Sequence, residues 1–187
     1  MEPWLFAGET DQLSNLFEVD LNIDGVCYNS VEQFYQVEKA RYGGNLRGVE
    51  VLMSAQSGRA AKIAARSIDF GNLAGWYPEV AQGVMRKALR VKFSADPFRS
   101  LLVSTYPRLL AENVVNMYWG IGLSPVDARR FNPAQWLGHN WMCGLLTEFK
   151  DEIRQEKMIE LVPECSFECE DEREVVFGDA GEHGSSK

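Results

Sequence analysis

A carboxylate and an amine lie on the same face of one predicted helix. Glu32 and Lys39 are seven residues apart. A helix turning about 100° per residue brings both to one side, separated by roughly 10 Å along its axis. Gln36 lies between them, and Tyr35 flanks this polar column (Glu32, Gln36 and Lys39). A carboxylate can exchange protons or stabilise a cation, and an amine kept neutral by burial can act as a nucleophile. The same pattern is also typical of a solvated polar face.

Three further segments place polar residues beside aromatic residues or glycine. They are Trp76 with Lys87, the group Glu112, Asn116, Trp119, Gly120 and Gly122, and the group Gly138, His139, Asn140 and Gly144. Each has a structural explanation. Tryptophans are mostly core residues, closely spaced glycines serve tight turns, and Asn140 suits the N-cap of a following helix. Lysines such as Lys62 and Lys87 usually belong to a solvated face. Taken singly, none of these segments establishes a site.

The helix that would carry the polar column has a marked start and an apolar side. Ser30 suits an N-cap, and Gln33 follows at the spacing of a capping box. Val31, Phe34 and Val37 lie on the side opposite the polar column and are predicted to be core. The sequence therefore predicts a rigid helix from Ser30 that could position the polar column.

The remaining elements follow from periodicity and from turn residues. Alternation around Asp24-Gly25 predicts a hairpin over residues 19–28. Residues 3–20 are expected to be extended or irregular, and a short apolar run predicts a strand at 109–116. Further helices are predicted at residues 46–56, 58–67, 78–93, 97–105 and 140–155.

Composition and charge exclude several classes of site. The 187 residues carry a net charge of −8, and all of it belongs to residues 151–187, so residues 1–150 are neutral. A neutral body argues against a broad electrostatic grip on nucleic acid. Four cysteines without a CxxC pair and only two histidines give little support to a metal site or a Ser-His-Asp triad. We therefore expect no metal and no cofactor.

The chain is expected to form one domain followed by an acidic tail. Residues 1–158 form the predicted globular domain, and residues 159–187 lose periodicity, gain acidic residues and are predicted to be disordered. No window is apolar enough to span a membrane, and the N-terminus shows no secretion signal. Together with the cysteine pattern, these features favour an intracellular, cytoplasmic protein. The oligomeric state stays open.

The segments match one known family when they are read in order. They are Leu13-Ser14-Asn15, Asp24-Gly25 with Tyr28, Ser30-x-Glu32 leading to Lys39-Ala40, Ala61-Lys62, Trp76, Lys92-Phe93, Leu110-x-Glu112, Asn116-x-x-Trp119-Gly120-Ile121-Gly122, and Gly138-x-Asn140 with Gly144. In this order and spacing the chain resembles the NADAR family, the YbiA-like N-glycosidases. The resemblance runs from about Leu13 to Phe149 and thus covers essentially the whole predicted domain.

The resemblance implies both a fold and an activity. Members are mainly α (α+β), compact single multi-helical domains with a small β-hairpin or sheet. They cleave an N-glycosidic bond between ribose and a base or amine. Their substrates include phosphoribosylamino-pyrimidine intermediates of riboflavin synthesis and ADP-ribosylated guanine in nucleic acid. The expected partner is accordingly a nucleotide-like small molecule or ADP-ribosylated nucleic acid.

The resemblance also implies residue roles that suit this chemistry. Departure of a nitrogen base leaves oxocarbenium-like charge on the sugar, which a carboxylate stabilises. Lys39 would be the nucleophile that forms a Schiff base, Glu32 its acid/base partner, and Glu112 a ligand of the ribose hydroxyls or a second acid/base. The ammonium of Lys39 is expected within bonding reach of Glu32 or Glu112. The expected substrate-binding residues are Asn15, Tyr35, Lys62, Trp76, Lys87, Asn116, Trp119, Gly120 and Asn140, with Trp76 and Trp119 stacking on a base and Lys62 and Lys87 contacting phosphate.

One departure from the family pattern leaves other functions open. Asn116 stands where many members carry aspartate, and the interval from Glu112 to Trp119 is one residue shorter than usual. An amide cannot take a proton or stabilise a cation at neutral pH. The first alternative is therefore a non-catalytic module that binds ADP-ribose or an NAD derivative. A second is an interaction protein whose acidic tail recruits partners.

Overall fold

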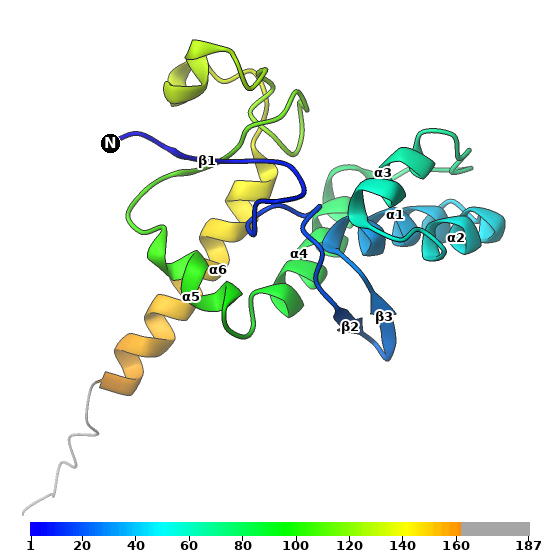
Figure 1. The fold of residues 1–187 in the computed structure, drawn as a ribbon, viewed down its shortest axis with the longest axis horizontal. Helices are drawn as coiled ribbons and strands as arrows, with labels where there is room; N and C mark the ends of the chain where they lie inside the picture. The colour runs from blue at the N-terminus through cyan, green and yellow to red at the C-terminus, as the bar shows by residue number, and fades with distance from the viewer. Residues whose placement is uncertain (162–187) are drawn as a thin grey trace, which may run out of the picture.

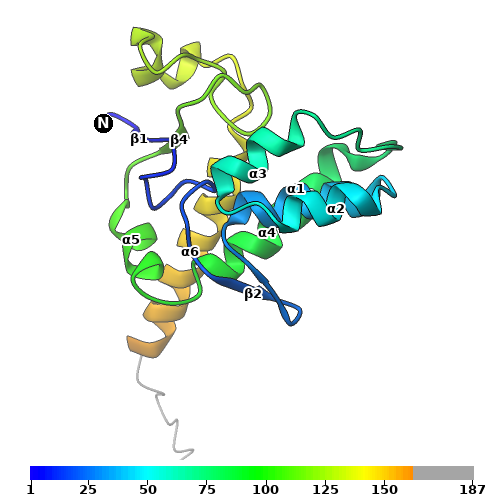
Figure 2. The same ribbon diagram turned by 45° about the vertical axis from the view of Figure 1, so that its right-hand side comes forward.

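Helices dominate the residues that the structure describes, and three of the other helices pack around α1. The structure is a computed structural model that describes residues 1–161. Helix α1 packs against α2, α3 and α4, and Figure 2 shows these helices gathered around it. Helices α5 and α6 pack together on the other side of α4 (Figure 1). The predicted mainly helical class is confirmed, with α-helices α1 (Val31–Tyr42), α2 (Leu46–Met53), α3 (Gly58–Ala65), α4 (Ala81–Lys92), α5 (Phe98–Ser104) and α6 (Trp141–Leu161), and shorter turns η1 (Trp76–Val80), η2 (Ala128–Phe131) and η3 (Pro133–Gln135).

The predicted start of α1 is confirmed, with one difference in the capping bonds. The Ser30 hydroxyl oxygen accepts the backbone N–H of Gln33 at 3.1 Å, as an N-cap does. The Gln33 side-chain oxygen accepts the N–H of Asn29 at 2.8 Å, where a capping box would use that of Ser30. The Gln33 amide also donates to the Leu52 carbonyl oxygen at 3.0 Å. This buried glutamine therefore fixes the start of α1 against the end of α2.

The polar side of α1 is buried, which the sequence pattern did not decide. Val31, Phe34 and Val37 are buried as predicted. Glu32 and Tyr35, on the other side, are only 3% and 4% exposed. A carboxylate is rarely so deeply buried without a partner or a task. The solvated-face explanation therefore fails at the first turns of α1.

Two small sheets position the chain around the helices. The predicted hairpin is confirmed as antiparallel strands β2 (Leu21–Ile23) and β3 (Val26–Tyr28). Asp24 and Gly25 both have positive φ, 52° and 81°, as in the two-residue turns that match strand twist. The other sheet pairs β1 (Trp4–Phe6) in parallel with β4 (Leu110–Glu112). Through this pairing Phe6 fixes the position of Glu112 in the sheet.

Several element boundaries differ from the predicted ones. The strand predicted at 109–116 ends at Glu112, because the N–H of Val114 folds back to the Glu112 carbonyl oxygen at 2.9 Å. Helix α4 begins at Ala81 after the turn η1, later than predicted. Helix α6 continues to Leu161, beyond its predicted end at 155. The predicted tail thus begins as helical backbone, and residues 162–187 lie outside the described residues. No helix within residues 1–161 is long and apolar enough to cross a membrane.

Candidate active site

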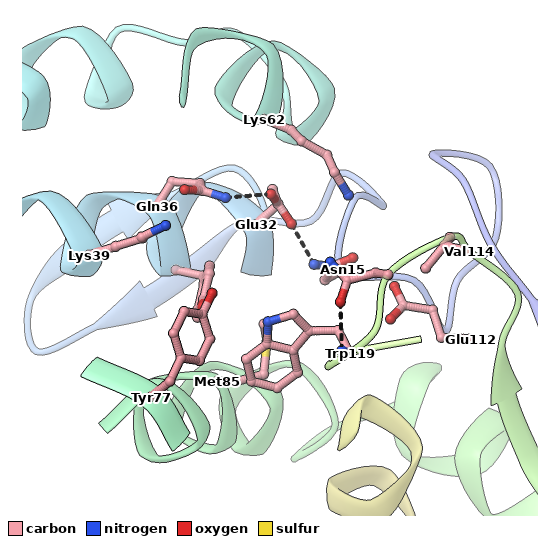
Figure 3. A pocket seen from close by; sticks show the side chains of 12 residues that line it. Asn15, Glu32, Gln36, Lys39, Lys62, Tyr77, Met85, Glu112, Val114 and Trp119 are labelled. Carbon is pink, nitrogen blue, oxygen red and sulfur yellow. Dashed lines mark hydrogen bonds between the residues drawn. The ribbon is translucent and has the colours of Figure 1, made fainter. Parts of the chain in front are cut away.

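One cavity of about 220 Å³ opens where α1, α3, η1 and the loop after β4 meet (Figure 3). Segments far apart in the chain supply its wall, from the loop before β2 to the loop after β4. The structure brings to it eight of the predicted residues, Asn15, Glu32, Tyr35, Lys39, Lys62, Glu112, Asn116 and Trp119. It adds Gln36, which the polar column contained, and Tyr77, Met85 and Val114, which no sequence pattern had indicated.

The Glu32 carboxylate is held by two side-chain amides. Asn15 Nδ2 donates to Glu32 Oε2, and Gln36 Nε2 donates to Oε1 at 2.8 Å (Figure 3). Asn15 and Glu32 are also joined through their backbones, where the N–H of Glu32 donates to the Asn15 carbonyl oxygen at 2.9 Å. Each carboxylate oxygen keeps a further lone pair. Glu32 is therefore fixed in orientation while it retains the capacity to accept a proton or another hydrogen bond.

A buried lysine holds the segment that carries Asn15. Lys92 is 2% exposed, and its Nζ donates to the Ser14 carbonyl oxygen at 2.6 Å. The rings of Phe17, Phe93 and Phe98 surround it at 5.2 to 5.5 Å. Burial lowers the pKa of Lys92 to about 7, partly opposed by the charge of Asp11. Lys92 thus holds the backbone at Ser14, the residue next to Asn15.

Lys39 lines the cavity without an ion pair to either carboxylate. Its Nζ lies 4.3 Å from the centroid of the Phe70 ring, and within the described residues no carboxylate oxygen lies within 4.0 Å of it. The expected bonding reach to Glu32 or Glu112 is therefore not found. The reason is that Gln36 occupies the intervening turn and already donates to Glu32. Burial lowers the pKa of Lys39, an effect partly offset by the charge of Glu32.

Glu112 is a buried carboxyl group that shares the cavity with Glu32. It is 4% exposed, and its Oε2 has no hydrogen-bond partner. Burial raises the pKa of Glu112 to about 7; Lys62 acts to lower it, and Glu32 adds to the rise. A carboxyl group with a pKa near 7 can donate or accept a proton at neutral pH. It therefore has the property of a general acid or base.

The raised pKa of Glu112 predicts a pH-dependent stability. Its pKa is 4.5 ordinarily and about 7 in the folded protein, so the folded state keeps a proton that the unfolded state loses. The contribution to the unfolding free energy is full below pH 4.5 and is lost as the pH rises through 7. It amounts to about 3 kcal/mol. Urea titrations from pH 5 to 8 should show a smaller decline in Glu112→Gln than in the unsubstituted protein. Equal declines would contradict the assignment.

Comparisons with known proteins agree with the fold. A sequence model described as the NADAR domain matches residues 6–154. The chain belongs to the NADAR family. This confirms the resemblance inferred from the ordered segments.

Individual relatives support the same NADAR assignment. N-glycosidase YbiA of Escherichia coli K12 is 29% identical over 150 residues, which cover 77% of this chain and 82% of YbiA. The NMR structure of E. coli YbiA superimposes with a TM-score of 0.65 at 26% identity, covering 84% of this chain and 89% of that one. Protein irg-1 of Caenorhabditis elegans is 28% identical over 131 residues, 67% of this chain and 61% of irg-1. The family and the YbiA relatives support an N-glycosidase-like function for this NADAR protein.

Asn116 stands where many NADAR members carry aspartate, and its side chain forms hydrogen bonds with the backbone of its own loop. Its Oδ1 accepts the N–H groups of Tyr118 and Trp119 at 2.9 and 2.8 Å. This turn directs Trp119 inward, where it lines the cavity at 8% exposure. An amide oxygen accepts these bonds as a carboxylate oxygen would. Asn116 can therefore hold this turn as an aspartate would.

Trp76 and Lys87 do not reach the cavity, contrary to the predicted stacking and phosphate contacts. Trp76 is 1% exposed, packs between the rings of Tyr35 and Tyr42, and donates from Nε1 to Tyr35 Oη at 3.3 Å. Trp76 therefore holds the ring of Tyr35 in place through packing and this hydrogen bond. The exposed Lys87 forms an ion pair with Asp24 in the hairpin turn. Sequence spacing could not show which of two adjacent aromatic residues faces the cavity, and here it is Tyr77.

Asn140 does not line the cavity but forms a hydrogen bond with the backbone of Glu112. Its Oδ1 accepts the N–H of Glu112 at 3.2 Å, and its Nδ2 donates to the Leu110 carbonyl oxygen at 3.0 Å. Asn140 directly precedes α6, and its side-chain hydrogen bonds connect it to strand β4 and hold that strand in place. The predicted contact with substrate is therefore replaced by a positioning role for Asn140.

Gly120 is required by close packing and does not line the cavity. A Cβ atom at this position would lie 2.5 Å from Val114 Cγ2 and 2.9 Å from the carbonyl oxygens of Glu112 and Val114. We expect Gly120→Ala to lower the unfolding free energy by about 1–3 kcal/mol. Chemical denaturation of this variant measures the loss. Gly83→Ala is the control, because a Cβ at Gly83 meets no atom within 4 Å. Equal stability of the two variants would contradict the packing role.

Proposed function

We propose that this NADAR protein is an N-glycosidase that hydrolyses the bond between ribose C1′ and a nitrogen of a base or amine. The observation that carries the proposal is the common cavity of Glu32, Lys39 and Glu112. A half-buried amine with a lowered pKa and a carboxyl group with a raised pKa meet there. Such opposed shifts are typical of acid–base and nucleophilic sites. The YbiA relatives, named N-glycosidases, support the same reaction class.

The size and polarity of the cavity suit a sugar. Its volume of about 220 Å³ is below the roughly 300 Å³ at which pockets for larger ligands begin. Two buried oxygens in its wall, Asn15 Oδ1 and Glu112 Oε2, have no hydrogen-bond partner. Unpaired buried acceptors are costly, and ribose hydroxyl groups would satisfy both. In this proposal the ribose occupies the space between Glu112 and the polar column.

The first step of the proposed reaction uses Lys39 as nucleophile. Its neutral amine bonds to C1′ as the C1′–N bond breaks, and the departing nitrogen keeps the electron pair and takes a proton from Glu112. The Glu32 carboxylate stabilises the positive charge at C1′ and accepts, through one bridging water, the proton that the Lys39 nitrogen loses. The lone pair of the Lys39 nitrogen then forms a double bond to C1′ as the C1′–O4′ bond breaks. The ring oxygen O4′ keeps the electron pair of that bond and takes the proton from Glu32, which leaves a protonated Schiff base between Lys39 and C1′.

Water completes the cycle. It adds to the Schiff-base carbon, and the C1′–N bond to Lys39 breaks. The sugar leaves with C1′ as an aldehyde that recloses, and Lys39 recovers its amine. The water step releases one proton, which returns to Glu112, and on reclosure the O4′ proton passes to the former carbonyl oxygen. One water is therefore consumed per bond cleaved. Glu112 thus acts as the acid of the first step, and Glu32, held by its two hydrogen bonds, acts as the base.

The alternative of a non-catalytic binder rested on Asn116. Its amide oxygen is occupied by the two backbone N–H groups of the loop. An amide performs that task as well as a carboxylate, so Asn116 does not favour a loss of catalysis. The interaction-protein alternative rests on the acidic tail, most of which lies outside the described residues. Neither alternative makes use of the lowered pKa of Lys39 beside the raised pKa of Glu112.

Product analysis tests the proposed function. The protein is incubated with phosphoribosylamino-pyrimidine riboflavin intermediates, NAD, and oligonucleotides carrying ADP-ribosylated guanine, and products are followed by mass spectrometry. We expect release of a free base or amine from at least one of them. Borohydride added during turnover should reduce the Schiff base and attach the sugar to Lys39. Tight calorimetric binding without released base would instead establish the binder.

A further inference from the structure

The segment that carries Asn15 has no helix or strand to hold it. Residues 11–17 form consecutive turns, which are closed by local bonds such as the one from the Leu16 N–H to the Ser14 hydroxyl oxygen at 3.1 Å. Ser14 and Asn15 are nevertheless only 1% and 5% exposed. A buried, irregular segment depends on contacts from other elements to keep one conformation. Such contacts therefore decide where the Asn15 side chain lies in the cavity.

Lys92 supplies one of these contacts. It is the last residue of α4, and its Nζ donates at 2.6 Å to the carbonyl oxygen of Ser14, which lies 78 residues away in the chain. The rings of Phe17, Phe93 and Phe98 pack around the amine. Because the amine is enclosed in this way, Lys92 is a fixed donor, and it ties the irregular segment to the end of α4.

Glu32 supplies another contact to the same segment. Asn15 Nδ2 donates to Glu32 Oε2 (Figure 3), and the Glu32 N–H donates to the Asn15 carbonyl oxygen at 2.9 Å. Ser14 and Asn15 are consecutive, so a single peptide link joins these bonds to the one from Lys92. A continuous connection therefore runs from the end of α4 to the buried carboxylate on α1.

Burial of the Lys92 amine destabilises the folded protein. The pKa of Lys92 is lowered from 10.5 to about 7 by burial, which the charge of Asp11 only partly opposes. The loss of stability is therefore largest at pH 7 and below, and it disappears as the pH rises toward 10.5. A methionine would fill a similar volume without this loss, but it has no N–H to donate. A residue that lowers stability and donates one well-placed hydrogen bond indicates a functional role.

We propose that Lys92 is a positioning residue for the reaction, which acts through Asn15 to hold the Glu32 carboxylate in its working orientation. This inference rests on the proposed function, in which Glu32 is the base. Lys92 does not line the cavity, so it forms no bond to the substrate. Its effect on turnover passes through Asn15, whose Nδ2 holds Glu32 and whose unpaired Oδ1 is available to the sugar.

Lys92→Met separates stability from turnover. The variant keeps the packing and loses the donor, so its urea unfolding midpoint at pH 7 should stay the same or rise. Its kcat on a substrate found by mass spectrometry should fall about ten- to a hundredfold, as for a catalytic group displaced by roughly 1 Å. Lys150→Met is the matched control. Lys150 is 4% exposed and donates to the Arg108 carbonyl oxygen at 3.2 Å, but neither residue lines the cavity, so kcat should stay unchanged.

A double-mutant cycle tests whether Lys92 acts through Asn15. Asn15→Ala removes the amide that holds Glu32. In that background, Lys92→Met should lower kcat by less than about twofold, because two residues that act in one connection are not additive. A full further loss in the double variant would overturn the connection through Asn15.

NMR spectroscopy measures the same connection without any substrate. In Lys92→Met the side-chain amide signals of Asn15 should shift, and the Glu32 backbone N–H should exchange with solvent about tenfold faster or more, because both report the bonds between these two residues. Both signals should stay unchanged in Lys150→Met.

The outcomes separate this proposal from the proposed function. The positioning role is overturned if Lys92→Met leaves both NMR signals or kcat unchanged. It is also overturned if Lys92→Met unfolds or has a lower unfolding midpoint, because Lys92 would then serve the fold alone. Altered NMR signals in a protein that turns over none of the candidate substrates would defeat only the proposed function.

Discussion

Replacing Lys39 with alanine is expected to abolish turnover, lowering kcat by about a thousandfold or more. The reason is that the proposed reaction passes through a covalent bond between C1′ and this nitrogen. The side chain is half-buried and forms no ion pair within the described residues. Its removal should therefore change the unfolding midpoint little. Steady-state kinetics on a substrate found by mass spectrometry, with circular dichroism melting curves, measures both quantities.

A second lysine provides the control for Lys39→Ala. Lys87 lies outside the cavity and pairs with Asp24 on the surface. Lys87→Ala should therefore keep kcat within about twofold of the unsubstituted protein, as surface substitutions usually do. The borohydride adduct should persist in Lys87→Ala and vanish in Lys39→Ala. If Lys39→Ala kept a normal rate, the Schiff-base route would be wrong, and direct attack by water would have to replace it.

Glu32→Gln is the second substitution with a large expected effect. Glutamine preserves the shape of the side chain but cannot accept the proton from Lys39 or stabilise positive charge at C1′. General acid–base groups contribute about 10²- to 10⁴-fold, and we expect a loss of kcat in this range. The amides of Asn15 and Gln36 both donate to Glu32, so one of them must turn to accommodate the new amide. KM should change less than kcat, because the sugar hydroxyl contacts are assigned to Asn15 and Glu112.

A neighbouring glutamate on α1 provides the control for Glu32→Gln. Glu38 pairs with Arg41 and does not line the cavity. Glu38→Gln removes the same charge from the same element, yet its kcat should stay unchanged. Equal losses in the two variants would indicate a general charge effect. A normal rate in Glu32→Gln would transfer the role of base to Glu112, whose pKa is raised to about 7.

Elements with local causes were predicted correctly from the sequence. The Ser30 cap and the apolar spacing of Val31, Phe34 and Val37 act within a few residues of the chain, and they define α1. The hairpin at Asp24-Gly25 follows in the same way from two residues that tolerate positive φ. The ordered family segments added the identity of most cavity residues, because order and spacing survive where single residues are ambiguous.

The tertiary structure alone decided which of these residues meet. The polar column is compatible with water or with burial, and only the segments around Asn15 and Glu112 determine that α1 is covered there. The parallel pairing of β1 with β4, more than a hundred residues apart, brings Glu112 to its place. It is also packing that turned Trp76 inward and Tyr77 toward the cavity. A helical or strand pattern specifies the faces of an element but not its neighbours. Burial and the pKa of Glu112 both depend on those neighbours.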